Sequence, residues 1–431
     1  MTDPTTTAAR IGDALGAAAI WHEDRCSWIA PVVEEVAGER PRLSYRPLGR
    51  SLYDGTAGVG LFLAELAVAT GELRYARVAR GAARHAAADG ALGEDDEPGL
   101  YTGTLGRAFA LARISEALDD AGLAESAAAL LRGPIAISDE TDLISGLAGT
   151  VIGLVASERW MAGGMVERAT PLCEVILDRA ETVDGRSSWP TVRPEDRMGN
   201  LLGLSHGVSG IALSLAECGA ASGRSDLLAG ATAGFAHESL HFDAAHGNWP
   251  DLRSRTRTGA RGPSFVVAWC HGAAGMALAR ARALPLLDDP GLYQQALRSL
   301  ETTVQATRLA LDADGAEFCL CHGLSGNADI LLEGSRLVAG ESAAAWGAAA
   351  MAVAEAGIER YGDSGHHWPC GPVSEMNPTL MLGVAGVGLF LLRLTNPSIA
   401  SPLSIGGRHV EATPASQPPR STPSQEVVRA S

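Results

Sequence analysis

The chain has 431 residues, of which 46% are hydrophobic and 19% are charged, so it is long and apolar enough to bury a large core. Its net charge of −16 disfavours nucleic acid as a partner, because binding to phosphates depends on basic side chains. Lysine is absent and all 34 basic residues are arginine, which excludes catalysis through a lysine Schiff base and excludes a P-loop lysine.

The first ten residues, MTDPTTTAAR, lack the basic-then-apolar order of a signal peptide, and we expect residues 1–8 to be flexible. No apolar run approaches the roughly 20 residues that a membrane-spanning helix needs. Seven cysteines are scattered along the chain, which argues against a disulfide framework and favours metal binding or catalysis. These features predict a soluble, cytoplasmic protein without a membrane span.

A Gly-x-x-Gly motif, called a corner below, recurs seven times along the chain. Each corner opens a stretch rich in Ala, Leu, Val and Ile with hardly a charge, which is typical of a buried helix. In chain order, the leading glycines of corners one to seven are Gly55, Gly103, Gly146, Gly207, Gly272, Gly323 and Gly383. Successive spacings of 48, 43, 61, 65, 51 and 60 residues leave room for two helices and their loops.

The stretches between corners, such as residues 74–88 and 345–361, carry charges on one face only and predict outer helices. Strand signals, such as alternating β-branched runs closed by Asn-Gly or Asp-Gly, are missing. We therefore expect an all-α fold over residues 9–396: an α/α toroid of seven inner and seven outer helices. An open solenoid of the same helix pairs is the alternative. The Ser/Pro-rich segment 397–431 has no apolar period and is expected to be disordered.

Two corners carry residues that are good zinc ligands. Cys270 in corner five, with Cys321 and His322 in corner six, can supply three ligands of a tetrahedral zinc site if the corners touch. Three protein ligands leave the fourth position open for water or substrate, which is typical of a catalytic zinc. Ordinary buried thiols are the alternative, and Cys319 could replace one ligand.

The remaining cysteines and several histidines are expected to be structural. This set comprises Cys26, Cys173, Cys218, Cys370, His237, His241 and His246. Cys370 lies near His366 and His367 in the sequence, so a second metal cluster there is a further alternative.

The motifs WCHG (269–272), CHG (321–323), SHG (205–207) and NPTLMLGVAG (377–386) resemble the lanthionine synthetase C (LanC) cyclases, in their stand-alone form. The similarity runs from about Ile11 to Asn396, and residues 242–253, FDAAHGNWPDLR, resemble the cyclase half of bifunctional lanthipeptide synthetases. The resemblance implies an α/α toroid with one zinc ion per chain. It also implies an enzyme that closes thioether rings in peptides by adding cysteine thiols to dehydroalanine or dehydrobutyrine.

Residue by residue, the resemblance implies that Cys270, Cys321 and His322 hold the zinc. It implies catalytic roles for Asp142, in DLISGLAG, and for His206, in LSHGVSG. A zinc-bound thiol is deprotonated, and its attack on a dehydro residue gives an enolate that needs a proton, for which histidine is suited. Asp142 either orients His206 or takes the displaced thiol proton.

The resemblance extends to one more position and fails at another. His271 occupies the aromatic-or-histidine position that follows the first zinc cysteine, and we count it among the candidate catalytic residues. Stand-alone members often have an active-site arginine four residues before that cysteine, where this chain has Val266. Arg261 or another loop arginine could substitute.

The expected partners are a dehydrated, cysteine-containing precursor peptide and separate dehydratase or kinase/lyase enzymes. Three other functions remain open. A glycosidase or terpenoid-type cyclase on the same ring is disfavoured by an aromatic content of 5% and by the lack of paired carboxylates at the corners. The others are a scaffold stapled by structural zinc and a family member that adds glutathione to dehydroamino acids.

Overall fold

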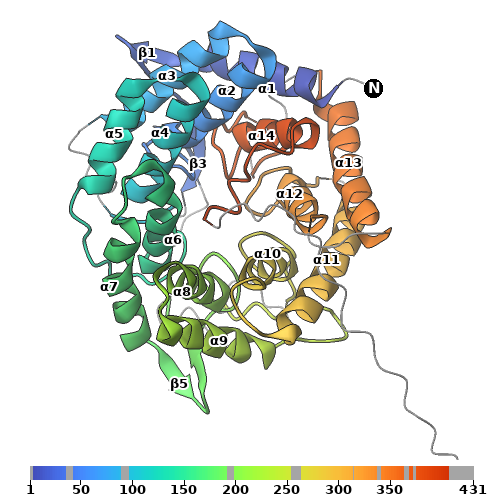
Figure 1. Ribbon diagram of the computed structural model, residues 1–431. Helices are drawn as coiled ribbons and strands as arrows, with labels where there is room; N and C mark the ends of the chain where they lie inside the picture. Colours follow the sequence, from blue (N-terminus) through green and yellow to red (C-terminus); the bar gives the residue numbers. More distant parts are fainter. Residues whose placement is uncertain are drawn as a thin grey trace, which may run out of the picture.

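A computed structural model describes residues 3–34, 42–88, 97–191, 199–253, 264–313, 315–336, 341–363, 368–371 and 375–406. Within these ranges, α-helices form two concentric rings (Figure 1). The inner helices are α2 (Thr56–Thr70), α4 (Thr104–Leu118), α6 (Leu147–Ser157), α8 (Val208–Ser222), α10 (Ala273–Ala283), α12 (Leu324–Gly334) and α14 (Val384–Thr395). The outer helices are α1 (Pro4–Ala18), α3 (Leu73–Ala87), α5 (Ala121–Arg132), α7 (Met165–Asp178), α9 (Ser225–Ser239), α11 (Pro290–Leu311) and α13 (Glu341–Tyr361). A short 3₁₀ helix, η1 (Glu158–Trp160), follows α6.

The corners begin the inner helices, as the sequence predicts. Each of the seven leading glycines is the N-cap residue of an inner helix. The second glycine of a corner allows the preceding loop to cross the first helical turn, because a Cβ at Gly326 would lie 1.9 Å from the Leu320 carbonyl oxygen. The corner therefore folds back on its own helix.

Backbone hydrogen bonds between corners close the ring. Each corner donates an N–H to a carbonyl of the next, from one to seven and back to one. The bonds are Tyr53 to Tyr101 (2.8 Å), Tyr101 to Ile144 (2.9 Å), Leu143 to Ser205 (3.0 Å), Ser205 to Cys270 (3.2 Å), Cys270 to Cys321 (3.3 Å), Cys321 to Met381 (2.9 Å) and Met381 to Tyr53 (2.9 Å). The toroid is therefore confirmed and the open solenoid is wrong.

The segment after α14 fills the middle of the ring, where Figure 1 shows it as a red trace. Ile399, Leu403 and Ile405 are buried. Tyr101 Oη donates to the Pro402 carbonyl (2.9 Å), and Trp269 Nε1 donates to the Leu403 carbonyl (3.2 Å). The expected disordered tail is thus wrong for residues 397–406, because a plug built of turns buries side chains without any helical period; residues 407–431 lie outside the described part.

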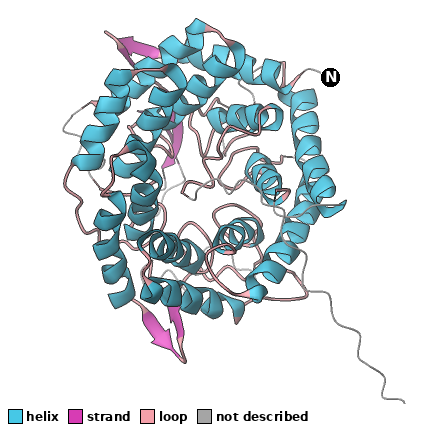
Figure 2. Cartoon of the chain, in the orientation of Figure 1, coloured by secondary structure: helices cyan, strands magenta, loops and turns pink. Residues whose placement is uncertain are grey.

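The other differences from expectation lie in short segments. Residues 4–8, expected to be flexible, belong to α1, whose N-cap Asp3 accepts a hydrogen bond from the Thr6 N–H. Three hairpins lie between or beside the helices (Figure 2): β1 (Ile20–His22) with β2 (Arg25–Ser27), β3 (Ile29–Glu34) with β4 (Arg42–Pro47), and β5 (Glu181–Val183) with β6 (Arg186–Ser188). The turn of the third is an Asp-Gly pair, Asp184 (φ 50°) and Gly185 (φ 75°), which is a hairpin signal, so the expectation that such signals are missing is wrong here.

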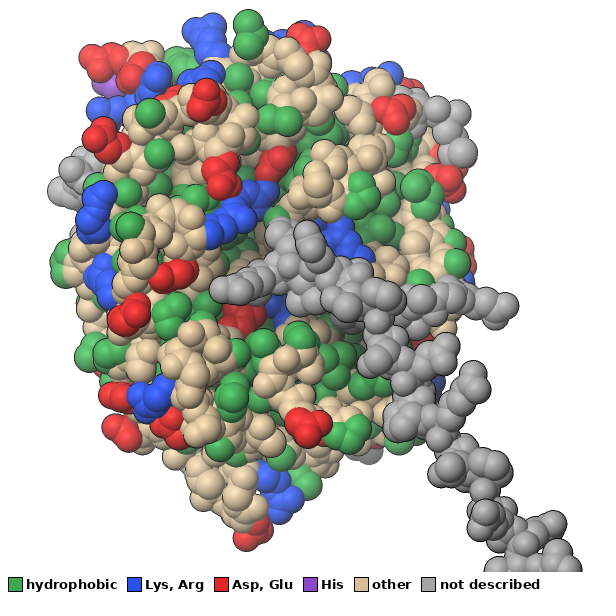
Figure 3. All heavy atoms as spheres, in the orientation of Figure 1, with side chains coloured by type: hydrophobic (Ala, Val, Ile, Leu, Met, Phe, Trp, Pro, Cys, Tyr) green, Lys and Arg blue, Asp and Glu red, His purple; other side chains and the backbone are tan. Residues whose placement is uncertain are grey.

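The charges lie mainly on the outer ring. On the face shown in Figure 3, acidic and arginine side chains are interspersed, so the net charge of −16 does not gather into one patch on that face. No helix in the described part of the chain combines the length and the apolarity that crossing a bilayer requires.

Candidate metal and catalytic site

A cavity of about 330 Å³ opens where five corners meet at one mouth of the ring. Its lining residues are Tyr53, Ile144, Ser205, His206, Arg253, Trp269, Cys270, His271, Cys321 and His322. Five of the six site residues expected from the sequence are among them, and the sixth, Asp142, lies directly behind His206. The fold therefore brings together residues that are up to 180 positions apart, from Asp142 to His322.

Two sulfur atoms and one imidazole converge in this cavity. The Sγ atoms of Cys270 and Cys321 and a ring nitrogen of His322 all lie within 4.8 Å of one another. Ligand atoms on a tetrahedral zinc ion with Zn–S bonds of about 2.3 Å are about 3.8 Å apart. Tyr53 Oη also donates a hydrogen bond to Cys321 Sγ (3.0 Å), as outer partners of metal-bound sulfur commonly do. The donor set and its spacing fit a zinc ion.

The thiols of Cys270 and Cys321 differ in pKa. A hydrogen bond with Cys321 lowers the pKa of the Cys270 thiol to about 7, and His322 and Arg253 add to the effect against the opposing influence of burial. The same hydrogen bond, together with burial, raises the pKa of Cys321. The first proton is therefore lost from Cys270, and a metal ion that binds both sulfurs must displace the second.

A second group of possible ligands shares His322. Glu317, Cys319 and His322 also place their ligand atoms within 4.8 Å of one another. Hydrogen bonds to Cys319 and Glu317 raise the pKa of His322 to about 10, so a metal ion must displace a proton from this ring as well. Cys319 is fully buried and does not line the cavity.

Asp142 and His206 form a close pair from corners three and four. His206 Nδ1 lies 2.5 Å from Asp142 Oδ2, while Asp142 Oδ1 accepts the N–H groups of Ile144 (3.0 Å), Ser145 (2.9 Å) and Gly146 (3.0 Å). Burial opposes protonation of His206, but the hydrogen bond and charge of Asp142 outweigh it and raise the pKa of His206. The pair leaves Nε2 as the ring nitrogen that can reach a molecule in the cavity.

His271 has different surroundings, although it occupies the same corner position as His206 and His322. It is buried, its Nε2 has no hydrogen-bond partner among the described residues, and burial lowers its pKa to about 4. His271 is therefore a neutral ring at the wall of the cavity.

Arg253, the last residue of the FDAAHGNWPDLR stretch, also lines the cavity, although it is not among the expected site residues. The Asp251 carboxylate holds its guanidinium, accepting from Nε (3.0 and 3.1 Å) and from Nη2 (2.6 Å), and this pairing raises the pKa of Arg253. The positive charge of this half-exposed guanidinium opposes protonation of His206 and helps to lower the pKa of Cys270. Val266 does not line this cavity, and Arg261 lies outside the described residues.

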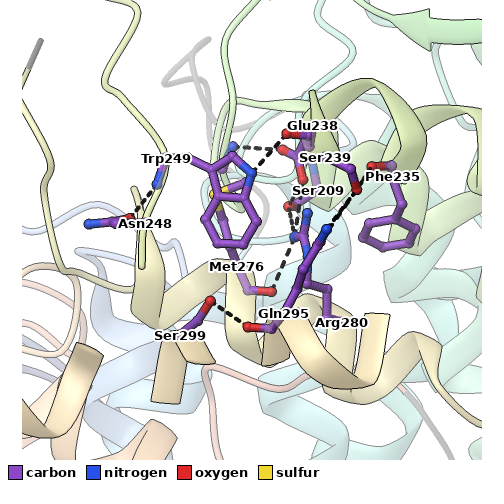
Figure 4. A network of polar contacts seen from close by, with 11 residues as sticks. Ser209, Phe235, Glu238, Ser239, Asn248, Trp249, Met276, Arg280, Gln295 and Ser299 are labelled. Carbon is purple, nitrogen blue, oxygen red and sulfur yellow. Dashed lines mark hydrogen bonds and ion pairs between the residues drawn. The ribbon is translucent and has the colours of Figure 1, made fainter. Parts of the chain in front are cut away.

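A buried ionic cluster anchors the loop that carries Arg253 (Figure 4). Glu238 and Arg280 are paired (3.2 Å) with both side chains fully buried, and the Trp249 ring lies 4.2 Å from the Arg280 guanidinium. Trp249 Nε1 donates to the Glu238 carbonyl (2.9 Å), while the Glu238 carboxylate accepts the N–H groups of Gly203 and Ser209 (3.0 Å each). One residue, Glu238, therefore holds the loop that leads to Arg253 through its backbone carbonyl and the corner that holds His206 through its carboxylate.

The residues expected to be structural lie away from the cavity. Cys26, Cys173, Cys218 and Cys370 are buried thiols, and none lines the cavity. His237 packs against His241 with ring centres 5.2 Å apart, and His246 lies 3.1 Å from Asp243. The alternative second metal cluster depends on His366 and His367, which lie outside the described residues.

Comparisons with known proteins agree with this architecture. Nisin cyclase has a similar structure, with a TM-score of 0.60 at 18% identity over 80% of this chain and 89% of that one. Two other structures are more distant. One is a possible GH105 family member from Salmonella enterica (TM-score 0.45, 13% identity, 91% of this chain and 92% of that one), and the other is the unsaturated glucuronyl hydrolase from Bacillus sp. GL1 (TM-score 0.46, 14% identity, 92% of this chain and 96% of that one). No curated protein sequence matches significantly. The family model for lanthionine synthetase C-like proteins matches residues 46–405, most of the chain, so this protein belongs to the lanthionine synthetase C-like family.

Proposed function

We propose that this protein is a zinc-dependent lanthipeptide cyclase. It adds cysteine thiols of a dehydrated precursor peptide to dehydroalanine or dehydrobutyrine in the same peptide, forming (methyl)lanthionine rings. The observation that carries the proposal is that one cavity of a LanC-like toroid holds both a Cys-Cys-His ligand set and the Asp142–His206 pair. The structural similarity to nisin cyclase supports it.

Cys270, Cys321 and His322 would hold one zinc ion and leave its fourth position facing the cavity. Zinc bound there would lower the pKa of a substrate cysteine thiol, so that the thiol binds as a thiolate. Tyr53 supports the site because its hydroxyl donates to Cys321 Sγ, which stabilises negative charge on that sulfur.

His206 supplies the proton that completes the addition. The thiolate sulfur forms a bond to the β-carbon, the C=C electron pair moves toward the carbonyl oxygen, and the resulting enolate takes a proton at its α-carbon. The proton that the thiol loses on becoming a thiolate passes to solvent, and His206 regains a proton from solvent after each addition. Asp142 raises the pKa of His206 and so favours the protonated form that can act as an acid, and its Nε2 is the atom that donates. Both oxygens of Asp142 are already engaged, which favours its role in orienting His206 over a role in accepting the thiol proton.

Arg253 and His271 act on the substrate rather than on the metal. Asp251 engages Nε and Nη2 of Arg253, so Nη1 is the guanidinium nitrogen left to donate to the enolate oxygen. Arg253 would thereby take the place of the arginine that is absent at Val266. His271, which is neutral, offers a ring nitrogen at the cavity wall without adding charge.

The substrate is a peptide that a separate dehydratase, or a kinase/lyase enzyme, has already dehydrated, because ring closure needs the alkene. The addition is an isomerisation: one thiol disappears and the peptide mass does not change. Glutathione, if it were the thiol substrate instead, would add its own mass.

Short synthetic peptides with one dehydroalanine and one cysteine at varied spacing provide the test. We expect zinc-loaded protein to reduce the number of alkylatable thiols per peptide at constant mass, faster than in a protein-free control, and a chelator to stop the reaction. Persistent thiols with glutathione adducts would replace ring closure by intermolecular addition. If neither product forms and removing zinc unfolds the chain, the zinc-stapled scaffold is the better description.

A further inference from the structure

Six of the seven corners share one backbone hydrogen bond. In each of them, the residue after the leading glycine donates its N–H to the carbonyl of the residue six positions before that glycine. In corners four and six these bonds are Val208 to Leu201 (3.0 Å) and Leu324 to Glu317 (2.8 Å). In corner six this turn places the side chain of Glu317, six positions before the glycine, close to that of His322, one position before it.

Histidine occupies the latter position in three corners, and its neighbours differ. Corner four has Leu201 six positions before its glycine, and His206 takes its carboxylate, Asp142, from the adjacent corner. In corner five Gly272 has a φ of 76° and the turn differs, with the His271 carbonyl accepting from the Ala268 N–H (3.0 Å). Corner six alone of the three places a carboxylate, that of Glu317, within its own turn.

Glu317 contacts His322 directly. Its Oε2 lies 3.0 Å from His322 Nε2, and its own carbonyl is fixed by the bond to Leu324 at the start of α12. A histidine that binds a metal through one ring nitrogen commonly donates its other N–H to a carboxylate, which fixes the tautomer and the ring orientation.

We propose that Glu317 is a positioning residue that prepares His322 for the metal: its carboxylate accepts the Nε2–H, so that Nδ1 is the nitrogen offered beside Cys270 and Cys321. This inference rests on the metal site in the proposed function. It assigns Glu317 to the outer shell of that site rather than to a second site with Cys319.

The placement of Cys319 supports this choice. Cys319 is fully buried and does not line the cavity, whereas Cys270, Cys321 and His322 all do. A metal ion held by Glu317, Cys319 and His322 would have two ligands that do not line the cavity, which is the space that a peptide thiol can enter.

The test measures zinc affinity without any peptide, by competition with a chromophoric chelator. For Glu317→Ala we expect one zinc per chain, bound about 10–100-fold more weakly than by the wild type. Glu317→Gln should lose less, because its amide oxygen still accepts from Nε2–H but carries no charge. Glu140→Gln is the matched control: the same position in corner three, with Ser145 where corner six has His322. Circular dichroism of each metal-free variant checks the fold.

Cobalt(II) distinguishes an outer-shell residue from a ligand. Because both thiolates remain, the sulfur-to-cobalt charge-transfer absorption of Glu317→Ala should equal that of the wild type, and Cys319→Ala should not change it. Wild-type zinc affinity in Glu317→Ala would overturn the proposal. So would loss of zinc from Glu317→Ala and Cys319→Ala while Cys270→Ala retains it, since Glu317 would then be a ligand. If zinc affinity depends on Glu317 but no ring closes, the proposed function fails and this inference stands; if the wild type binds no zinc, both fail.

Discussion

The substitution Asp142→Asn removes the charge that holds the candidate general acid. An asparagine side chain still offers an oxygen to the backbone N–H groups of Ile144, Ser145 and Gly146, so the local turn should survive. It then presents an NH₂ group to His206 Nδ1, which can no longer donate. The protonated form of His206 loses its partner, and its pKa falls.

The size of the effect follows from the two losses. A hydrogen bond to a charged group contributes about 1.5–3 kcal/mol, and the 43% exposure of the His206 side chain favours the lower part of that range because solvent screens the pair. A loss of about 1.5–3 kcal/mol corresponds to a roughly 10- to 150-fold weaker binding of the proton to His206, and the screening favours the lower end of that range. Misorientation of the ring adds to it, so we expect ring closure to slow by about 10²–10⁴-fold.

The assay is the pH dependence of thiol loss at saturating peptide. A general acid works only while protonated, so the rate falls as the pH rises through the pKa of His206. Because Asp142 raises that pKa, Asp142→Asn should move the fall to lower pH, and zinc content should stay at one per chain. His206→Asn should keep the zinc, be slow, and lack this limb of the profile. A wild-type rate and profile in Asp142→Asn would refute the assigned pair.

Three further outcomes are expected. Cys270→Ala and Cys321→Ala should each lose nearly all bound zinc, by metal analysis, while circular dichroism shows the helical fold largely kept; full zinc occupancy in either variant would remove the site. Arg253→Gln should keep its zinc but lower kcat by about 10–10²-fold. This is less than the loss expected for a buried oxyanion donor, because Arg253 is half-exposed. An unchanged kcat would exclude Arg253 from the reaction. A chain ending at residue 396 should melt far below the full-length protein, because it lacks Ile399, Leu403 and Ile405, whose burial contributes about 1.5–3 kcal/mol each. A chain ending at residue 406 should melt within a few degrees of the full-length protein; equal melting temperatures for the two truncated chains would show that the plug does not stabilise the ring.

The ring was predictable because its signal is local and repeated. A leading glycine followed by an uncharged apolar stretch marks each inner helix, and the same pattern at seven places implies seven equivalent units. Convergence of Cys270, Cys321 and His322 follows once the ring closes, since adjacent corners must then touch. The roles of Asp142 and His206 were predicted only from the resemblance to LanC cyclases, because their spacing in the sequence does not indicate that they pair.

Two features that could not be predicted, Arg253 at the cavity and the central plug, have no repeating pattern in the sequence. Arg253 reaches the cavity from a loop between α9 and α10, and its position depends on Trp249 packing over the buried Glu238–Arg280 pair, which is a tertiary contact. The central plug contains Ile399, Leu403 and Ile405 at unequal intervals in a Ser/Pro-rich sequence, which composition alone assigns to disorder. In both cases the environment, rather than the local sequence, determines where the residues lie.

Three successive corners place a histidine directly before the leading glycine, yet the environments of these rings differ. His206 faces the buried carboxylate of Asp142, which favours its protonated form. His271 is buried with an unpartnered Nε2, which favours its neutral form. His322 faces Glu317 through Nε2, which leaves Nδ1 for a metal. Since the corners share a backbone plan, the chemistry of each histidine depends on neighbours a few residues away or in the next corner, and an acid and a metal ligand can arise from copies of one repeat.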